Sequence, residues 1–209
     1  MNQNRSTASP SPNTAAATAP ARPGLDLIPW PIRTDRLVLR RLRPTDLDRL
    51  WEYRSLPEVH QWLGGGSITD FAAFEARFPS LCEHGIAVEL DGRVIGDLRA
   101  VVGDAWSQVG MEHLAKNTEA VLGWVFDPEA AGRGYATESV GALITACFAH
   151  LGVRRVSGSC FAVNEPSARL MKRLGMRLEE HSRKTALHRS GEWMDTMMFG
   201  VLADEWPER

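Results

Sequence analysis

Apolar and polar positions alternate with different periods in the two halves of the chain. In the first half, a period of two over residues 36–42 predicts a half-buried strand. Residues 47–55 carry apolar side chains at helical spacing, which predicts a helix. Two further strands, over 86–90 and 94–98, flank Asp91-Gly92, which is typical of a two-residue hairpin turn.

The second half alternates short apolar runs with helical stripes. Residues 120–126 form an apolar strand that ends at Asp127-Pro128, and a 3.6-residue stripe over 136–151 predicts a long helix. A further strand over 153–163 and a helix over 165–174 follow. Antiparallel strands followed by strand–helix–strand–helix predict an α+β fold with a mixed sheet.

Composition narrows the class of protein. The chain has 209 residues, of which 44% are hydrophobic and 24% charged, as expected for one globular domain. Its net charge of -2 supplies no broad positive field, so we expect neither nucleic acid nor a membrane as a partner. No apolar run reaches the roughly 18 residues that span a bilayer. The odd number of widely spaced cysteines predicts thiols in a reducing, cytoplasmic compartment.

The first 28 residues differ from the rest. Residues 1–23 consist mainly of Ser, Thr, Ala, Pro and Asn, with almost no large apolar side chain. Such a segment cannot offset the entropy lost on ordering, so we expect a disordered tail over 1–28 and one folded domain over 29–209. Residues 14–21 are too polar to form the apolar core of a signal peptide.

The segment with the clearest chemistry is 121–138, in which a strand, a proline, a glycine turn and a helix follow one another. Gly132 and Gly134 allow successive backbone N–H groups to converge at the positive end of the helix, which favours a phosphate. Arg133 adds a cation at the rim. The turn lacks the Lys-Ser/Thr of a P-loop, and Thr137 stands where a dinucleotide fingerprint needs its third glycine.

Three segments in order resemble the GNAT superfamily of N-acetyltransferases. Residues 131–138, Ala-Gly-Arg-Gly-Tyr-Ala-Thr-Glu, resemble its acetyl-CoA pyrophosphate loop. Residues 164–176 resemble its second CoA-facing helix, and 34–40 its opening strand. The C-terminal segments 191–195 and 202–206 are similar to the branch that contains the ribosomal-protein N-terminal acetyltransferases.

The resemblance implies one domain whose mixed, mostly antiparallel sheet is splayed at the cofactor cleft, with helices on both faces. It implies an enzyme that transfers acetyl from acetyl-CoA to a primary amine by direct attack through a tetrahedral intermediate. The acceptor would be a protein N-terminal α-amine or a small-molecule amine. The implied cofactor-binding residues are Val125, Phe126, Ala131, Gly132, Arg133, Gly134, Tyr135, Ala136, Thr137, Asn164 and Ser167.

Three residues are candidates for the catalytic steps. By resemblance, the N–H of Phe126 polarises the thioester carbonyl. Glu119, at the start of the 120–126 strand, is the first candidate for the general base, although many relatives have a glutamate nearer the middle of this strand, where this chain has Val121. Many relatives have a tyrosine acid at the position of Met171; Ser167, one turn earlier, is the candidate replacement. Glu119 could also be a solvated strand-end carboxylate, and Ser167 a residue that only satisfies backbone groups.

Other functions stay open from the sequence alone. A catalytically weak acyl-CoA-binding or sensing module would keep the same loop, and a nucleotide-binding protein could use the same turn. The histidines form no i,i+4 pair and no Cys-x-x-Cys is present, so no metal is expected. Residues 60–63 are a candidate wall for the acceptor, with Trp106 and Trp193 as further candidates. The protein is expected to be a monomer or a homodimer.

Overall fold

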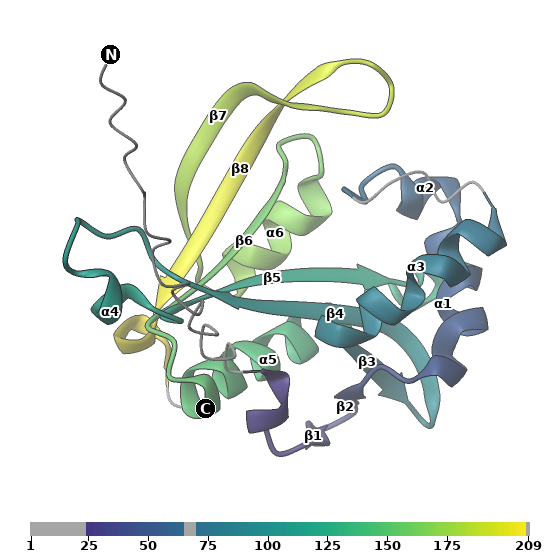
Figure 1. Cartoon of the computed structure of the whole chain (residues 1–209). Coiled ribbons are helices and arrows are strands. Elements are labelled where there is room, and N and C mark those ends of the chain that lie inside the picture. Colours follow the sequence, from purple (N-terminus) through teal and green to yellow (C-terminus); the bar gives the residue numbers. More distant parts are fainter. Residues whose placement is uncertain (1–23, 65–69, 208–209) are drawn as a thin grey trace, which may run out of the picture.

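An eight-stranded sheet runs through the molecule (Figure 1). The computed structural model describes residues 24–64 and 70–207. The strands are β1 (Ile32–Arg33), β2 (Val38–Arg41), β3 (Gly85–Leu90), β4 (Arg93–Gly103), β5 (Glu119–Phe126), β6 (Arg155–Phe161), β7 (Arg177–Leu187) and β8 (Trp193–Leu202). Their order is β1-β2-β3-β4-β5-β6-β8-β7, and only β5 and β6 pair in parallel. The predicted mixed, mostly antiparallel sheet is therefore confirmed.

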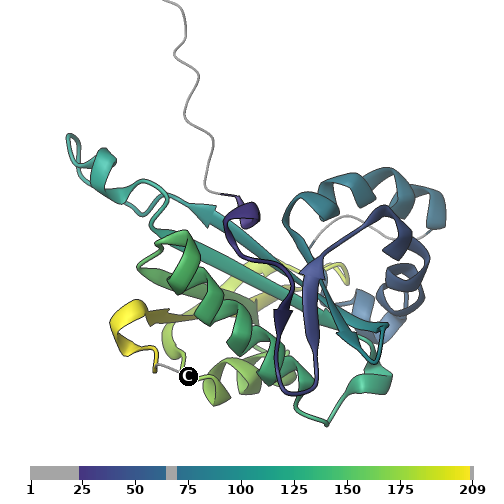
Figure 2. The ribbon, with the colours of Figure 1, turned by 90° about the horizontal axis from the view of Figure 1, so that it is seen from below.

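Helices cover both faces of this sheet (Figures 1 and 2). They are α1 (Leu47–Arg54), α2 (Pro57–His60), α3 (Phe71–His84), α4 (Glu112–Ala115), α5 (Tyr135–Leu151) and α6 (Glu165–Arg173). On one face, Leu50 of α1 and Phe74 of α3 pack against Ala87 of β3. On the other, Leu143 of α5 packs in the larger core that contains Leu122 of β5. Of the helices described, none is long and apolar enough to cross a membrane.

The sheet opens between the C-terminal halves of β5 and β6. The two strands pair only from Glu119 to Leu122, with Arg155 to Gly158 as partners. Beyond this point β5 stays paired with β4 as far as Phe126, whereas β6 pairs with β8. The expected splay is thus confirmed, and it places an opening between the two helix-covered faces.

The folded domain begins earlier than the composition indicates. Leu25–Leu27 form a 3₁₀ helix, and Leu25 and Ile28 are buried at 4% and 2% exposure. The indole Nε1 of Trp30 donates to the carbonyl of Leu25 at 2.7 Å. The boundary after residue 28 is therefore wrong, because these two apolar side chains belong to the core. The rest of the expected tail, residues 1–23, lies outside the described residues.

Candidate functional site

The glycine turn leads directly into α5. Gly132 and Gly134 have φ angles of 77° and 80°, a left-handed backbone that side chains disfavour. The first backbone hydrogen bond of the helix runs from the N–H of Glu138 to the carbonyl of Gly134 at 3.0 Å. The N–H groups of the preceding turn have no partner within the helix, and no side chain of Gly134 can cap them. They form a cradle for an anion at the positive helix end.

Arg36, which follows β1 in the chain, holds this turn in place. Its Nη1 donates to the carbonyl of Arg133 at 3.0 Å, and its guanidinium lies 4.6 Å from the ring centre of Tyr135. Its Nε donates to Glu138 at 2.7 Å, and the Thr34 hydroxyl donates to the same carboxylate at 2.6 Å. Burial would raise the pKa of Glu138, but these hydrogen bonds outweigh it and lower the pKa. Thr34, Arg36 and Glu138 all lie in the sequence motifs described above, but the sequence alone does not show that they bind one another.

A cavity of about 610 Å³, here named the α5 cavity, opens at the glycine turn. Its lining includes the predicted cofactor residues Val125, Phe126, Ala131, Gly132, Gly134, Tyr135, Ala136, Thr137, Asn164 and Ser167. Arg133 does not line it; its side chain is exposed, and its carbonyl accepts a hydrogen bond from Arg36. Arg173 of α6 does line it, and its Nε donates to the Thr137 hydroxyl at 3.4 Å. Arg173 is thus a cation at this site that the sequence reasoning missed.

The backbone of β5 presents its free groups to the opening in the sheet. The N–H of Asp127 donates to the carbonyl of Ile95 at 3.0 Å, and Val125 lies opposite Asp97 in the same register. Hydrogen-bonded pairs alternate along an antiparallel ladder, so the backbone of Val125 is engaged by β4. The backbones of Trp124 and Phe126 therefore face β6. Val125 lines the cavity, but the expectation that its backbone binds the cofactor is wrong, because β4 already engages its hydrogen-bonding groups.

Ser167 and Asn164 lie where β5 approaches α6. Nε1 of Trp124 donates to Oγ of Ser167 at 3.3 Å. The Oδ1 of Asn164 caps α6 by accepting the N–H of Ser167 at 3.3 Å. Met171, one turn further along α6, is completely buried and lines neither cavity described here. Ser167 is therefore the hydroxyl of α6 that faces the opening.

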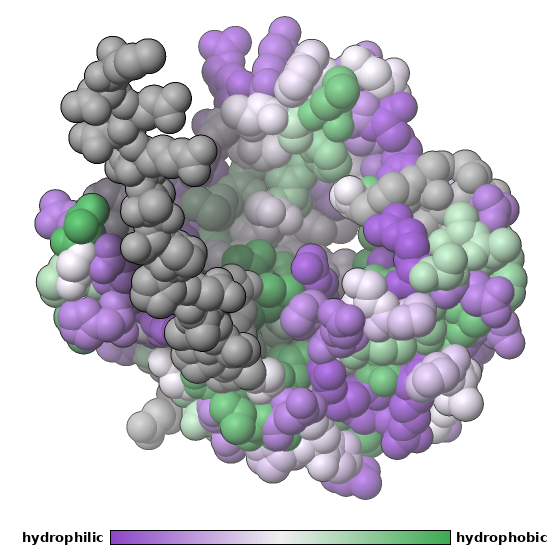
Figure 3. All heavy atoms as spheres, in the orientation of Figure 1, coloured by the Kyte–Doolittle hydropathy of each residue, from purple (hydrophilic) through white to green (hydrophobic). Residues whose placement is uncertain are grey.

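A second cavity of about 1050 Å³, here named the α3 cavity, lies on the α1 and α3 side of the sheet. Figure 3 shows a hollow on this side, between the β7–β8 hairpin and the α2–α3 region. Of the expected acceptor wall, Trp62 and Leu63 line it, whereas Trp106 and Trp193 do not and are 89% and 58% exposed. The residues that line both cavities are Trp62, Leu63, Trp124, Val125, Asn164 and Ser167. The two cavities therefore meet at the opening in the sheet.

A buried ion pair forms part of the wall of the α3 cavity. Nη1 of Arg54 lies 2.7 Å from Oδ2 of Asp97, and the Tyr53 hydroxyl donates to Oδ1 at 2.7 Å. Burial and the charge of Asp97 raise the pKa of Tyr53 well above its usual value, so this hydroxyl stays protonated. Asp97 is thus held by two donors.

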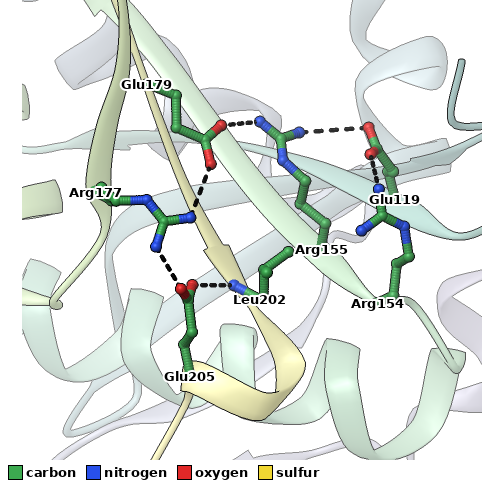
Figure 4. A network of polar contacts seen from close by, with 7 residues as sticks. All are labelled: Glu119, Arg154, Arg155, Arg177, Glu179, Leu202 and Glu205. Carbon is green, nitrogen blue, oxygen red and sulfur yellow. Dashed lines mark hydrogen bonds and ion pairs between the residues drawn. The ribbon is translucent and has the colours of Figure 1, made fainter.

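Glu119 lies at the other end of β5, away from both cavities. Its carboxylate forms ion pairs of 3.4 Å with Arg154 and with Arg155, within a network that continues to Glu179 of β7 (Figure 4). Glu119 and Phe126 are seven positions apart, which is about 23 Å along a strand. Sequence proximity to an apolar strand suggested a general base, but the structure does not bring Glu119 to the opening. We do not retain it in that role.

No metal centre is found in the part of the chain that the structure describes. Across residues 24–64 and 70–207, no three His, Cys, Asp or Glu side chains are grouped to hold an ion. Cys82, Cys147 and Cys160 are free thiols, and burial raises the pKa of Cys147 to about 12. The thiol of Cys147 therefore stays protonated at neutral pH and is a poor nucleophile.

Comparison with known proteins agrees with this geometry. A family model described as the acetyltransferase (GNAT) domain matches residues 36–177. The chain belongs to the GNAT acetyltransferase family. The uncharacterized N-acetyltransferase YnaD of Bacillus subtilis (strain 168) is 29% identical over 177 residues, which are 84% of this chain and 98% of the relative.

Solved structures of GNAT proteins have the same fold. An acetyltransferase of the GNAT family from Bacillus anthracis superposes with a TM-score of 0.71 at 25% identity, covering 84% of this chain and 100% of the other. RimJ of Mycobacterium smegmatis in complex with CoA-disulfide has a TM-score of 0.67 at 20% identity, covering 82% and 84%. At this sequence identity the likeness to RimJ shows a shared fold.

Proposed function

We propose that this GNAT protein transfers an acetyl group from acetyl-CoA to a primary amine, and that a free α-amino group is its preferred acceptor. One observation carries the proposal: an anion cradle and a separate second cavity meet at one opening in the sheet. A two-substrate transfer needs such an arrangement, because each substrate must reach the same point from its own side. A simple nucleotide-binding protein has no need of the second cavity.

Acetyl-CoA fits the α5 cavity through backbone groups that have no partner among the described residues, together with one side-chain cation. The N–H groups of the first turn of α5 suit the pyrophosphate, and Arg173 supplies a nearby cation. The free backbone edge at Trp124 and Phe126 suits the pantetheine amides, as a strand edge pairs with an extended peptide. The CoA-disulfide bound to RimJ supports placing a CoA-type ligand in this fold.

The residues at the opening account for the transfer. The Phe126 N–H would stabilise negative charge on the acetyl oxygen while the amine nitrogen bonds to the acetyl carbon. As the carbon–sulfur bond breaks, the hydroxyl of Ser167, oriented by Nε1 of Trp124, would donate its proton to the leaving thiolate and take up the proton that the newly acylated nitrogen loses, so that the amide and free CoA form and the serine is regenerated. Asn164 would position Ser167 by capping its N–H. None of these roles needs Glu119.

The acceptor preference follows from ionisation. Only a neutral amine can attack, and an α-amino group titrates near pH 8 whereas a lysine side chain titrates near 10.4. At neutral pH roughly a tenth or more of α-amines are neutral, against less than about 0.1% of lysines. Asp97 lines the α3 cavity, but Arg54 and Tyr53 already bind its carboxylate, so it is not a free base for the acceptor. An acceptor amine that is already neutral in solution needs no such base.

The test measures binding and turnover together. Thermal unfolding with acetyl-CoA should show a rise in melting temperature that ATP and NAD do not produce. CoA release with α-amine acceptors should then be followed for the wild type, Ser167→Ala and the control Ser139→Ala, whose hydroxyl contacts only backbone carbonyls of α5. We expect Ser167→Ala to lower kcat at least about tenfold and the control to have no effect.

The outcomes separate catalysis from a catalytically weak acyl-CoA-binding or sensing module. Binding of acetyl-CoA with no CoA release from any amine would favour the sensing module. No stabilisation by saturating acetyl-CoA would reject the proposal itself.

A further inference from the structure

Two arginines line the α3 cavity without a partner of their own. Arg77 of α3 and Arg99 of β4 both line it, and both side chains are exposed. In the described part of the chain, neither side chain forms an ion pair or a hydrogen bond. Most other cations around the site are engaged: Arg54 is paired with Asp97, and Arg36 with Glu138. Unpaired guanidinium groups in a cavity are available to a ligand.

The fold directs these two side chains into the same space. Arg77, Ser80, Leu81 and His84 recur at helical spacing and all line the cavity, so they form one face of α3. Arg99 lies opposite Gly85, the residue that follows this helix. Both arginines therefore occupy the α3 end of the cavity.

Among the described residues, Arg41 and not Arg99 binds the end of helix α3. The C-terminal carbonyls of α3 at Cys82 and Glu83 already accept hydrogen bonds from Nη2 of Arg41. On its other side Arg99 lies opposite Gly123, where a Cβ would be 4.0 Å from the Cβ of Arg99. Because Gly123 has no side chain, it leaves Arg99 uncovered toward the cavity.

The acidic residues of the cavity do not neutralise this end. Asp97 is bound to Arg54 and Tyr53. Glu180 lies on β7, and the row from Arg99 to Glu180 crosses β5, β6 and β8. Four strand spacings amount to about 19 Å, which exceeds the Debye length at physiological salt of about 8 Å. The α3 end of the cavity is therefore positively charged.

We propose that the amine acceptor carries an anionic group, a carboxylate or a phosphate, which Arg77 and Arg99 bind. This rests on the transferase function proposed above and names its substrate class. Arg99 lies opposite Gly123, the neighbour of Trp124, so its Cα is roughly 7 Å from the Cα at the opening. A guanidinium there can bind an acid only a few bonds from the reacting amine. Amino acids and peptides with an acidic N-terminal residue fit this description, whereas polyamines do not.

The experiment compares pairs of acceptors that share the same reacting amine, with an anionic group on one member and a neutral group on the other. The carboxylate pairs are aspartyl- and asparaginyl-alanine amide, and glutamyl- and glutaminyl-alanine amide; the phosphate pair is phosphoseryl- and seryl-alanine amide. Acetylation is measured for the wild type, Arg77→Gln, Arg99→Gln and the double variant. Arg33→Gln, an exposed arginine on β1, is the matched control.

We expect the wild type to prefer the acidic member of at least one pair by about tenfold or more in kcat/KM, because charge-assisted hydrogen bonds strengthen binding by that order. Arg99→Gln and the double variant should lose this preference through a higher KM for the acid, while the neutral member is unaffected. Arg33→Gln should keep it. Comparing the carboxylate pairs with the phosphate pair shows which anionic group of the acceptor the two arginines bind.

A binding measurement keeps this result separate from the question of catalysis. Titration calorimetry of N-acetyl-aspartyl-alanine amide and its asparaginyl counterpart into the CoA-saturated protein requires no turnover, and N-acetyl-phosphoseryl-alanine amide with its seryl counterpart serves the phosphate arm. Equal binding within every pair, no binding of any acid, or an unchanged preference in the double variant would overturn the inference. If neutral amines are nevertheless acetylated, the proposed function stands without it; if acetyl-CoA does not bind, the function itself has failed.

Discussion

The α5 cavity and the α3 cavity differ in how much of the chain is needed to build each one. The anion cradle of the α5 cavity comes from consecutive residues, 132–137, and is braced mainly by Arg36. The α3 cavity takes its lining from α1, α3 and the six strands from β3 to β8. A local segment can keep its conformation while distant elements change, whereas a cavity between elements changes whenever one of them shifts. The cofactor side and the acceptor side should therefore respond to different mutations.

The largest expected effect comes from the buried ion pair beside the α3 cavity. Asp97→Ala leaves Arg54 buried without a counter-charge, which should lower the free energy of unfolding by about 3–5 kcal/mol. Urea unfolding measures this, with Glu129→Ala as the control because its pair with Arg93 is exposed. The double variant Arg54→Met/Asp97→Leu should recover most of the loss. A loss in Asp97→Ala as small as in the control would contradict this account.

The next effect concerns the glycine turn. Gly132 has open space around its Cα but a φ of 77°, so Gly132→Val strains the backbone without a clash. A cost of about 1–2 kcal/mol in the left-handed region should weaken acetyl-CoA binding roughly 5–30-fold, as measured by calorimetry. Gly103→Val is the matched control: its surroundings are equally open and its backbone is a strand. Equal affinities in the two variants would remove the special role of the turn.

A smaller, pH-dependent effect is expected at Glu138. Its folded-state pKa is lowered, so its stabilising contribution is present above the ordinary glutamate pKa and is lost as the pH falls through the folded value. Glu138→Gln should therefore lower stability by about 1 kcal/mol at neutral pH and by progressively less below about pH 4.3. Unfolding measured from pH 3 to 7 tests this against Glu75→Gln, an exposed residue of α3. A difference that does not vary with pH would point to packing instead.

The smallest effect is expected at Glu119, where the sequence suggested a base. Glu119→Gln weakens an ion-pair network far from the opening, so kcat/KM and its pH profile should stay within about twofold of the wild type. A tenfold loss of kcat/KM, together with a shift on the acidic side of its pH profile, would mean that Glu119 acts on the reacting amine. In that case the two ends of β5 would not differ in function as described above.

The long elements with a clear period were predictable from the sequence, and the short ones were not. β5 and α5 were expected within one residue of their observed start and end, because an apolar run and a 3.6-residue stripe are local signals. β1, α2 and α4 have two to four residues each and show no period. Their conformation depends on what they pack against, which a pattern along the chain does not contain.

The site, like the fold, was predictable where it depends on neighbouring residues and not where it depends on distant ones. The sequence by itself determined the glycine turn, the helix that follows it and Ser167 in the first turn of α6, since each depends on residues a few positions apart. Only the tertiary structure decided that Val125 turns its backbone to β4, that Arg154 and Arg155 bind Glu119, and that Arg77 and Arg99 share one cavity. These facts depend on strand register and on contacts between distant segments, because a shift of one residue reverses the direction of every side chain on a strand.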